Sequence, residues 1–464
     1  MKKIVFVFTS LLGVFCATAQ DKGKALDSLF TKLYNEKKFF GNVLIAEKGA
    51  VVYQQSFGKA NVAANTDLNA ETVFELASVS KQFTAMGIML LKKQGKLSYE
   101  DTLRKFIPSL PYYNITVRQL LHHTSGLPDY MDLFSNNWDS TKIATNQDMI
   151  DMLVRYRPAV LFSPGEKWEY SNTGYALLAS IIEKASGMSY GDYLAKYIFK
   201  PLGMKRTSVY RRRFEKKVIP NYALGYVFDA GSKQFMLPDS LAATASMVYC
   251  LDGIVGDGTV NSTTNDLLKW DRALYTEQLV PADMMKEALE SGRLNSRMKT
   301  NYAFGWMISE PKGSGKVINH TGSWPGYATL IERHLDSDKT IILLRNHETP
   351  LTILQKVRNV LYDVKEQPKK EEVASVISTS DTLQQYAGEY ELAPGFTITI
   401  SVTGNKLFAQ ATGQEKFEVF AEKKDLYFLK VVEAKLQFNR DPAGKIISLT
   451  LFQGGQEVEG IKIK

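Results

Sequence analysis

The spacing of hydrophobic residues changes several times along this 464-residue chain, and each change marks a different kind of element. Residues 24–39 carry apolar side chains at the three- and four-residue spacing of an amphipathic helix. Residues 41–46 and 51–55 are apolar runs on either side of a Lys48-Gly49 turn, which predicts a β-hairpin. The first part of the chain is therefore expected to form a helix followed by two antiparallel strands.

A second hairpin is predicted far downstream, from strands at residues 328–333 and 340–344. A helix is predicted to follow it over residues 351–362. The two ends of this region are rich in strand patterns, whereas its middle is largely helical. This order predicts an α+β fold: an antiparallel sheet built from both ends, flanked by helices, with an inserted helical lobe.

The last part of the chain has a third pattern. Residues 366–380 include a run of charged and polar side chains, which predicts a linker between a first domain at 20–365 and a second at 381–464. Short alternating runs then recur at regular spacing, at residues 396–402, 406–411, 417–421, 426–432, 436–439, 446–452 and 458–463. Such runs, separated by turn residues, are typical of a small all-β sandwich or barrel.

The N-terminus has the pattern of a secretory signal peptide. A basic Lys2-Lys3 pair precedes an apolar run at residues 4–16, and Ala17-Thr18-Ala19 fits a cleavage site. Residues 1–19 are therefore expected to be removed, so that a periplasmic or secreted chain begins at Gln20. An uncleaved anchor or a lipid-modified Cys16 are the alternatives. No later stretch reaches 18 apolar residues, which predicts no transmembrane segment in the mature chain.

Composition and charge narrow the function further. The net charge of +8 comes with basic clusters that lack interleaved aromatic residues, which argues against nucleic-acid binding. Cleavage would leave Cys250 alone in an apolar run, where it is expected to be a small buried hydrophobe. Five histidines without a metal-ligand spacing, and no phosphate-cradling glycine loop, predict neither a metal site nor a cofactor. The expected partner is a small molecule or a short peptide.

The candidate nucleophile is Ser78, followed one helical turn later by Lys81. Ser-x-x-Lys occurs four times in the chain, but only Ser78 opens a segment with a strong helical pattern. At this spacing the hydroxyl and the amine lie on one face of the helix. Burial and the electropositive helix N-terminus both disfavour a positive charge on Lys81, which makes its amine a candidate acceptor for the Ser78 proton. Taken alone, the pair is also compatible with a capping serine and a solvated lysine.

Two further short motifs follow in the sequence. Tyr170-Ser171-Asn172 lies in a predicted loop between a turn and a helix beginning near Gly174, and an extended loop presents the first and third side chains on one side. His320-Thr321-Gly322 follows a strand-like Val317-Ile318 pair, and a glycine at a strand end permits close approach of a backbone or a substrate. Neither motif is specific alone. Their order after Ser78-Val79-Ser80-Lys81 is what indicates one active site.

With the three motifs together, the chain resembles the superfamily of penicillin-binding proteins and class C β-lactamases over about residues 24–365. The resemblance implies that the predicted α+β fold is of the β-lactamase/transpeptidase-like type. Secondary marks of the resemblance are Leu-His-His-Thr-Ser-Gly-Leu-Pro at 121–128, Pro-Gly-Glu-Lys-Trp-Glu-Tyr-Ser-Asn-Thr-Gly-Tyr at 164–175, and Gly-Asp-Gly at 256–258. Residues 381–464 resemble, more weakly, the small β-domain often attached to such hydrolases.

The resemblance implies a role for each motif residue. Ser78 is the residue expected to be acylated, and Lys81 and Tyr170 are expected to share the proton transfers, with the identity of the acylation base left open. Asn172 is expected to bind the substrate amide. Residues of the third motif are expected to line the other wall, with the backbone N–H groups of Ser78 and Ser323 as the oxyanion hole; they are His320, Thr321, Gly322 and Ser323.

The departure from the family pattern is His320. Members that act on β-lactams or transpeptidate usually carry a lysine there, which meets a substrate carboxylate. Histidine is mostly neutral at pH 7, which weakens the case for a dedicated β-lactamase. A histidine at this position resembles the esterase-like and peptidase-like members, so the resemblance favours those types, carboxypeptidase and aminopeptidase included. We therefore predict a serine hydrolase acting on an amide or ester, such as a D-amino-acid peptide or a carboxylic ester. A β-lactamase and a non-catalytic binding protein on the same fold are the alternatives.

Overall fold

The structure is a computed structural model of the chain, and its described residues are 10–311, 313–347, 353–364, 383–393, 396–412, 416–429, 434–453 and 456–463. The chain divides into two compact units, residues 1–364 and 365–464. The predicted linker at 366–380 lies outside the described residues.

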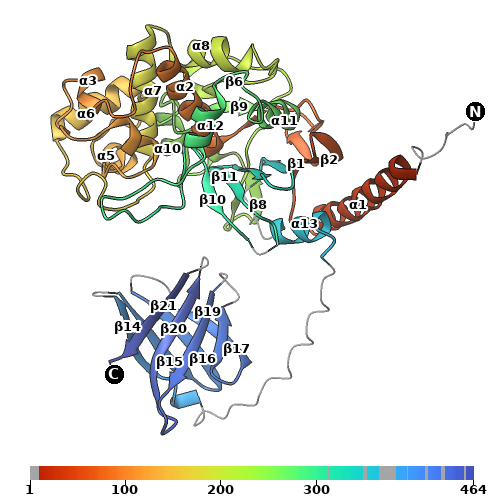
Figure 1. Cartoon of the computed structure of the whole chain (residues 1–464), viewed down its shortest axis with the longest axis vertical. Helices are drawn as coiled ribbons and strands as arrows, with labels where there is room; N and C mark the ends of the chain where they lie inside the picture. Colours follow the sequence, from red (N-terminus) through yellow and green to blue (C-terminus); the bar gives the residue numbers. More distant parts are fainter. Residues whose placement is uncertain are drawn as a thin grey trace, which may run out of the picture. The chain divides into compact units, whose positions relative to one another are not determined.

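The first unit is built on an antiparallel sheet that both of its ends supply (Figure 1). In spatial order its strands are β10 (Met307–Ser309), β11 (Val317–Trp324), β12 (Tyr327–His334), β13 (Lys339–Arg345), β1 (Gly41–Glu47) and β2 (Ala50–Phe57). The two ends of the unit meet where β1 pairs with β13, in a register that sets Gly41 opposite Arg345. Both predicted hairpins, and the sheet made from them, are confirmed.

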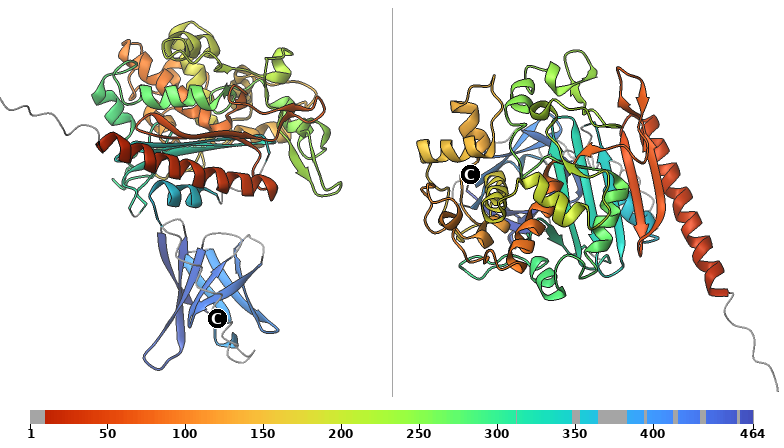
Figure 2. Two further views of the ribbon diagram at one scale, coloured as in Figure 1. Left: turned by 90° about the vertical axis from the view of Figure 1, so that its right-hand side faces the viewer. Right: turned by 90° about the horizontal axis from the view of Figure 1, so that it is seen from above.

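Two helices cover one face of this sheet, and the rest of the unit covers the other (Figure 2, left). They are α1 (Ser10–Asn35) and α13 (Leu354–Leu361), and their apolar side chains form one core cluster with the strands. The first of these helices ends at Asn35, four residues before the predicted end at 39, because Lys37 turns into the left-handed region with φ 57°. It also extends back to Ser10, which places residues 10–19 of the predicted signal peptide in helical conformation.

The opposite face carries the predicted helical lobe. Its helices are α2 (Lys81–Lys93), α3 (Leu103–Phe106), α4 (Val117–Leu121), α5 (Tyr130–Asn137), α6 (Asn146–Tyr156), α7 (Asn172–Ser186), α8 (Tyr190–Leu194), α9 (Arg212–Glu215), α10 (Ala245–Cys250), α11 (Thr264–Ala273) and α12 (Ala282–Ala288), with shorter turns η1 (Ala77–Ser80), η2 (Ala195–Phe199) and η3 (Pro238–Ser240). Helices α2 and α7 pack against each other in the large core cluster of the unit. They bring residues 78–81 next to residues 170–172.

Short strands connect this lobe to the sheet. They are β3 (Lys59–Asn61), β4 (Thr66–Asp67), β5 (Phe74–Glu75), β6 (Ser208–Val209), β7 (Val227–Asp229), β8 (Gln234–Met236) and β9 (Val260–Ser262). Strand β9 lies between β5 and β6 in a three-stranded sheet, and β5 leads directly into the turn that carries Ser78.

The second unit is a closed antiparallel barrel. Its strands are β14 (Gly388–Ala393), β15 (Phe396–Thr403), β16 (Lys406–Ala411), β17 (Phe417–Lys423), β18 (Leu426–Leu429), β19 (Ala434–Arg440), β20 (Ile446–Gln453) and β21 (Gln456–Lys462). The sequence was compatible with either a sandwich or a barrel. The pairing of β14 with β21 closes the sheet and shows that the domain is a barrel. Strand β14 was not predicted, although its Tyr390 is fully buried in the barrel core.

Candidate active site

The segment around Ser78 is held between two sheets and is itself strained. The backbone carbonyl of Leu76 accepts a hydrogen bond from the Thr329 hydroxyl (2.6 Å). The backbone N–H of Leu76 donates to the Val260 carbonyl (2.9 Å). Ala77 then adopts φ 48°, which costs energy for a residue with a side chain and is often found beside reacting groups. On the β11 side only a glycine fits, because a Cβ at Gly322 would lie 2.1 Å from the Leu76 carbonyl oxygen. Ser78 is thereby fixed at the edge of the lobe.

Lys81 is directed at Ser78, as predicted from their spacing. It is the first residue of α2, its side chain is fully buried, and its Nζ lies 3.0 Å from the Ser78 Oγ. The same nitrogen donates to the Asn172 Oδ1 (3.0 Å) and to the Asp257 backbone carbonyl (2.8 Å). Three fixed oxygens thus hold the amine, and one of them is the candidate nucleophile.

The Tyr170-Ser171-Asn172 segment meets this amine from the other side. Helix α7 begins at Asn172, two residues before the predicted start, because Ser171 caps it by accepting the Gly174 N–H (3.1 Å). Tyr170 lies in the extended segment before the cap, and the Lys81 Nζ lies 4.8 Å from its ring centroid. The tyrosine and the amide therefore both face Lys81.

His320 reaches the same region from β11, but as a neutral group. Its Nδ1 lies 2.6 Å from the Thr321 carbonyl and its Nε2 lies 2.9 Å from the Tyr302 hydroxyl, so Nδ1 donates and Nε2 accepts. Burial, reinforced by the charge of Lys81, lowers the pKa of His320 to about 3. This position therefore carries no cation at neutral pH.

The third motif lies within a strand, which corrects the expectation that its glycine stands at a strand end. Strand β11 continues to Trp324 because β12 pairs with it along its whole length, from Val317 opposite His334 to Trp324 opposite Tyr327. Side chains alternate along it, so His320 is buried and Thr321 is exposed. Ser323 borders the pocket described next, while the roles predicted for Thr321 and for the N–H groups of the oxyanion hole stay predictions.

Ser78 opens into a pocket with about 510 Å³ of empty space, its open mouth included. Its lining residues are Glu75, Ala77, Ser78, Tyr130, Met131, Asn172, Leu251, Asp252, Ile254, Asp257, Gly258, Thr259, Ser323 and Trp324. The lining combines an apolar wall with three carboxyl groups, and it contains no arginine, lysine or histidine. Such a surface suits a neutral or positively charged substrate better than an anionic one.

The carboxyl groups of the pocket differ in their surroundings. Asp257 accepts a hydrogen bond from the Tyr130 hydroxyl (2.9 Å), and burial raises its pKa. Asp252 forms an ion pair with Arg213 (3.1 Å). Glu75 has no hydrogen-bond or ion-pair partner among the described residues, and burial followed by the charge of Asp252 raises its pKa to about 7.

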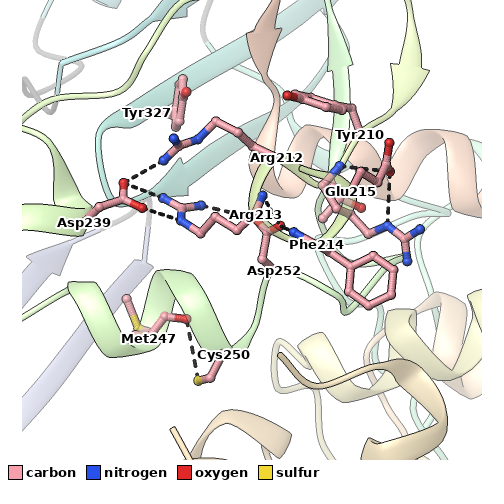
Figure 3. Close-up of polar contacts among 12 residues, drawn as sticks. Tyr210, Arg212, Arg213, Phe214, Glu215, Asp239, Met247, Cys250, Asp252 and Tyr327 are labelled. Atoms are coloured by element: carbon pink, nitrogen blue, oxygen red, sulfur yellow. Dashed lines mark hydrogen bonds and ion pairs between the residues drawn. The ribbon is translucent and has the colours of Figure 1, made fainter. Parts of the chain in front are cut away.

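Arg213 ties a surface segment to the pocket wall (Figure 3). Its guanidinium bonds both Asp239 (2.7 Å) and Asp252 (3.1 Å), and Asp252 also accepts the backbone N–H groups of Arg213 and Phe214 at 2.8 Å each. Ion pairs and hydrogen bonds therefore connect residues 213–214 to Asp239 and to Asp252 of the pocket wall. Cys250, in the same region, is a free buried thiol whose pKa is raised by burial.

Two functional features were missed from the sequence. The Asp257 carbonyl that holds Lys81 is a backbone group, which no side-chain pattern reveals. His123, named from the sequence only within the 121–128 mark of the resemblance, packs its ring 4.4 Å from that of Tyr170. Among the described residues no group of His, Cys, Asp and Glu is placed to hold a metal ion, and no helix is long and apolar enough to cross a bilayer.

Comparison with known proteins agrees with this geometry. Residues 26–360 match the Beta-lactamase family model, and residues 374–461 match a domain of unknown function, DUF3471. The chain is 42% identical to penicillin-binding protein 4* of Bacillus subtilis, over 96% of this chain and 100% of that protein. Among solved structures, the octameric penicillin-binding protein homologue from Pyrococcus abyssi is 26% identical with a TM-score of 0.65, covering 95% of this chain and 100% of that one.

A second solved structure of similar fold is that of an enzyme. The D-amino acid amidase from Ochrobactrum anthropi is 25% identical with a TM-score of 0.59, covering 74% of this chain and 96% of that one.

Proposed function

The chain belongs to the Beta-lactamase family, and from this premise we propose that it is a secreted or periplasmic hydrolase that forms an acyl-enzyme at Ser78 and cleaves a small amide or ester. The observation that carries the proposal is the buried Lys81 amine, 3.0 Å from the Ser78 Oγ at the wall of an open pocket. A hydroxyl is a weak nucleophile until a nearby base takes its proton, and the Lys81 amine, in its neutral form, is within reach of that proton.

The proposed reaction has two halves. In the first, the Ser78 Oγ bonds to the substrate carbonyl carbon while its proton passes to Lys81 or Tyr170. The carbon–nitrogen or carbon–oxygen bond then breaks, and the amine or alcohol leaves with that proton. In the second half, water attacks the acyl carbon and gives up a proton to the same groups. The bond between that carbon and the Ser78 Oγ then breaks, Oγ takes this proton back, and the acid is released. Asn172 is proposed to orient the substrate while it also fixes the Lys81 amine.

The charges of the site support a substrate without a carboxylate near the reacting bond. A neutral His320 stands where the family's β-lactam-directed members usually have a lysine. The pocket lining contains no arginine, lysine or histidine that could replace that positive charge. The apolar wall and the partnerless Glu75 instead suit an uncharged ester or a derivative of an apolar amino acid with a free amino group, the D-amino-acid class included. The solved D-amino acid amidase is a relative of that kind.

The proposal is tested by the intact mass of the protein after incubation with benzylpenicillin, with drug hydrolysis followed in parallel. We expect a mass increase of one penicilloyl group that persists for hours, because a hydrolase not built for β-lactams removes that acyl group slowly. Rapid drug hydrolysis without an adduct would instead favour the alternative of a β-lactamase. A protein inert to the drug, to 4-nitrophenyl esters and to D-amino-acid anilides would contradict the hydrolase and favour a binding protein.

Substrate charge should make the affinity depend on pH. For D-phenylalanine 4-nitroanilide we expect KM to fall about fivefold between pH 6 and pH 7, because Glu75, with its pKa raised to about 7, gains its charge there and can then pair with the substrate ammonium. With a pKa of about 7, the carboxyl is mostly neutral at pH 6, half ionised at pH 7, and approaches full charge only about one pH unit higher. Steady-state kinetics on the free and the N-acetylated anilide measure the effect, since pH effects on the chemical step act on both substrates.

The matched variant is Glu75→Gln, which keeps the shape of the side chain and removes its titration. It should abolish the difference between the two pH profiles while leaving turnover of the acetylated substrate within about threefold. Equal pH dependence of KM for both substrates in the wild-type protein would show that Glu75 does not meet the amine.

A further inference from the structure

We propose that His123 is a positioning residue that fixes Tyr170 in the active site by binding the chain on both sides of it; this inference rests on the proposed function. The backbone carbonyl of His123 accepts the Glu169 N–H (3.0 Å), and its imidazole Nδ1 accepts the Ser171 N–H (3.1 Å). One residue thus takes the hydrogen bonds of both neighbours of the tyrosine.

The ring of His123 also contacts the tyrosine directly. Its centroid lies 4.4 Å from that of Tyr170, 4.3 Å from Tyr302 and 5.0 Å from Tyr175. The imidazole is fully buried among these rings. Tyr170 therefore has the histidine ring packed against it and the Lys81 amine 4.8 Å from its centroid.

These hydrogen bonds require one protonation state of His123. An Nδ1 that accepts the Ser171 N–H carries no proton, so the proton of the neutral ring is on Nε2, which has no hydrogen-bond partner. Burial and the nearby charge of Lys81 hold the pKa of His123 well below its usual range. A protonated ring would present an N–H to the Ser171 N–H and would add a second cation beside Lys81.

The backbone at His123 explains the choice of residue. Its φ of 58° lies in the left-handed region, where histidine and asparagine are among the tolerated residues. The segment after it binds the same loop again, because Thr124 accepts the Gly165 N–H (2.8 Å) and Gly126 accepts the Leu161 N–H (2.8 Å). Of these attachment points, only those at His123 flank Tyr170 on both sides.

Two substitutions separate the two contributions of the side chain. His123→Asn tolerates the left-handed backbone and places an amide oxygen where Nδ1 was, so it keeps the acceptor and loses the ring. His123→Phe keeps a ring and leaves the Ser171 N–H without its acceptor. We expect the rate of acylation by a 4-nitrophenyl ester to fall less than tenfold in the first variant and about 10- to 100-fold in the second, since misplaced reacting groups typically cost that much.

The same pair of variants tests the route through Tyr170. In a Tyr170→Phe background, His123→Phe should lower acylation by less than threefold, because the group it positions is already absent. Hydrogen–deuterium exchange of the full chain should also show at least tenfold faster exchange of the Ser171 amide in His123→Phe, and near wild-type exchange in His123→Asn. His347→Phe, which replaces another buried histidine outside the site, controls for a general loss of packing.

The outcomes are distinguishable. An acylation loss of the same size in both backgrounds, or unchanged Ser171 exchange in His123→Phe, would refute the positioning role. If wild-type protein reacts with no ester, the proposed hydrolase fails, and the exchange measurement still decides whether His123 fixes the loop.

Discussion

Replacing Ser78 with alanine is expected to lower kcat/KM by about 10⁴-fold or more, for every substrate that the wild-type protein turns over. The substitution removes the only atom that forms the bond to the substrate in the proposed reaction. It leaves Lys81 bound to Asn172 and to the Asp257 carbonyl, so the rest of the site keeps its hydrogen bonds. We therefore expect the free energy of unfolding to change by no more than about 1 kcal/mol.

Steady-state kinetics and thermal unfolding on the same preparation measure both effects. The chain supplies a matched control in Ser296→Ala, because Ser296 also precedes a lysine by three positions but is exposed. That variant should keep the activity and the stability of the wild-type protein. Activity retained within tenfold by Ser78→Ala would show that another group attacks the substrate.

How far the site could be predicted depends on the distance between its parts in the sequence. Ser78 and Lys81 are one helical turn apart, so local geometry alone brings their side chains together, and the structure gives 3.0 Å between Oγ and Nζ. Nothing local joins them to Asn172 or His320. For these residues the prediction relied on the order of three motifs and on the family resemblance, and packing of α7 and β11 around α2 then supplied the geometry.

The parts that were missed have physical reasons. Residues 320–323 are His-Thr-Gly-Ser, which has no apolar alternation, so the strand was expected to end with this motif, although pairing with β12 continues it to Trp324. Strand β14 has only two apolar inward residues among its glutamates, too few for a strand pattern. His123 acts by accepting backbone N–H groups of a distant loop, and a sequence does not show which amides a side chain will meet.

The barrel was predicted as a class and not as a topology. Alternation along each run identifies which side chains face inward, as the burial of Ile398 and Ile400 in β15 confirms. A sandwich and a barrel share that alternation, and they differ in which strands pair at the edges. The pairing of β14 with β21 involves residues at opposite ends of the domain, so only the folded structure decides between them.

Replacing Lys81 with methionine is expected to lower kcat/KM about 10³-fold or more, with only a moderate change in the free energy of unfolding. Loss of the amine removes a proton carrier 3.0 Å from the nucleophile, and groups that act as a unit each account for most of the rate. Stability should respond differently. A fully buried amine is costly to desolvate when charged, whereas methionine fills the same space without a polar atom.

Two effects oppose each other in that stability. The substitution relieves the burial of the amine, but it leaves the Asn172 Oδ1 and the Asp257 carbonyl without the donor they had, at about 1–3 kcal/mol each. We therefore expect the free energy of unfolding to change by no more than about 2 kcal/mol in either direction, measured by urea unfolding. Lys299→Met, the exposed lysine of the Ser296 pair, is the control and should change neither quantity.

The double variant Ser78→Ala/Lys81→Met separates a catalytic lysine from one that only supports the fold. If Lys81 acts by moving the Ser78 proton, the double variant should be no less active than Ser78→Ala alone, because the second change removes a function that has already been lost. A further loss of 10²-fold or more in the double variant, or a large loss of stability in Lys81→Met alone, would mean that the amine mainly organises Asn172 and residue 257. The two roles predict opposite results for the same three proteins.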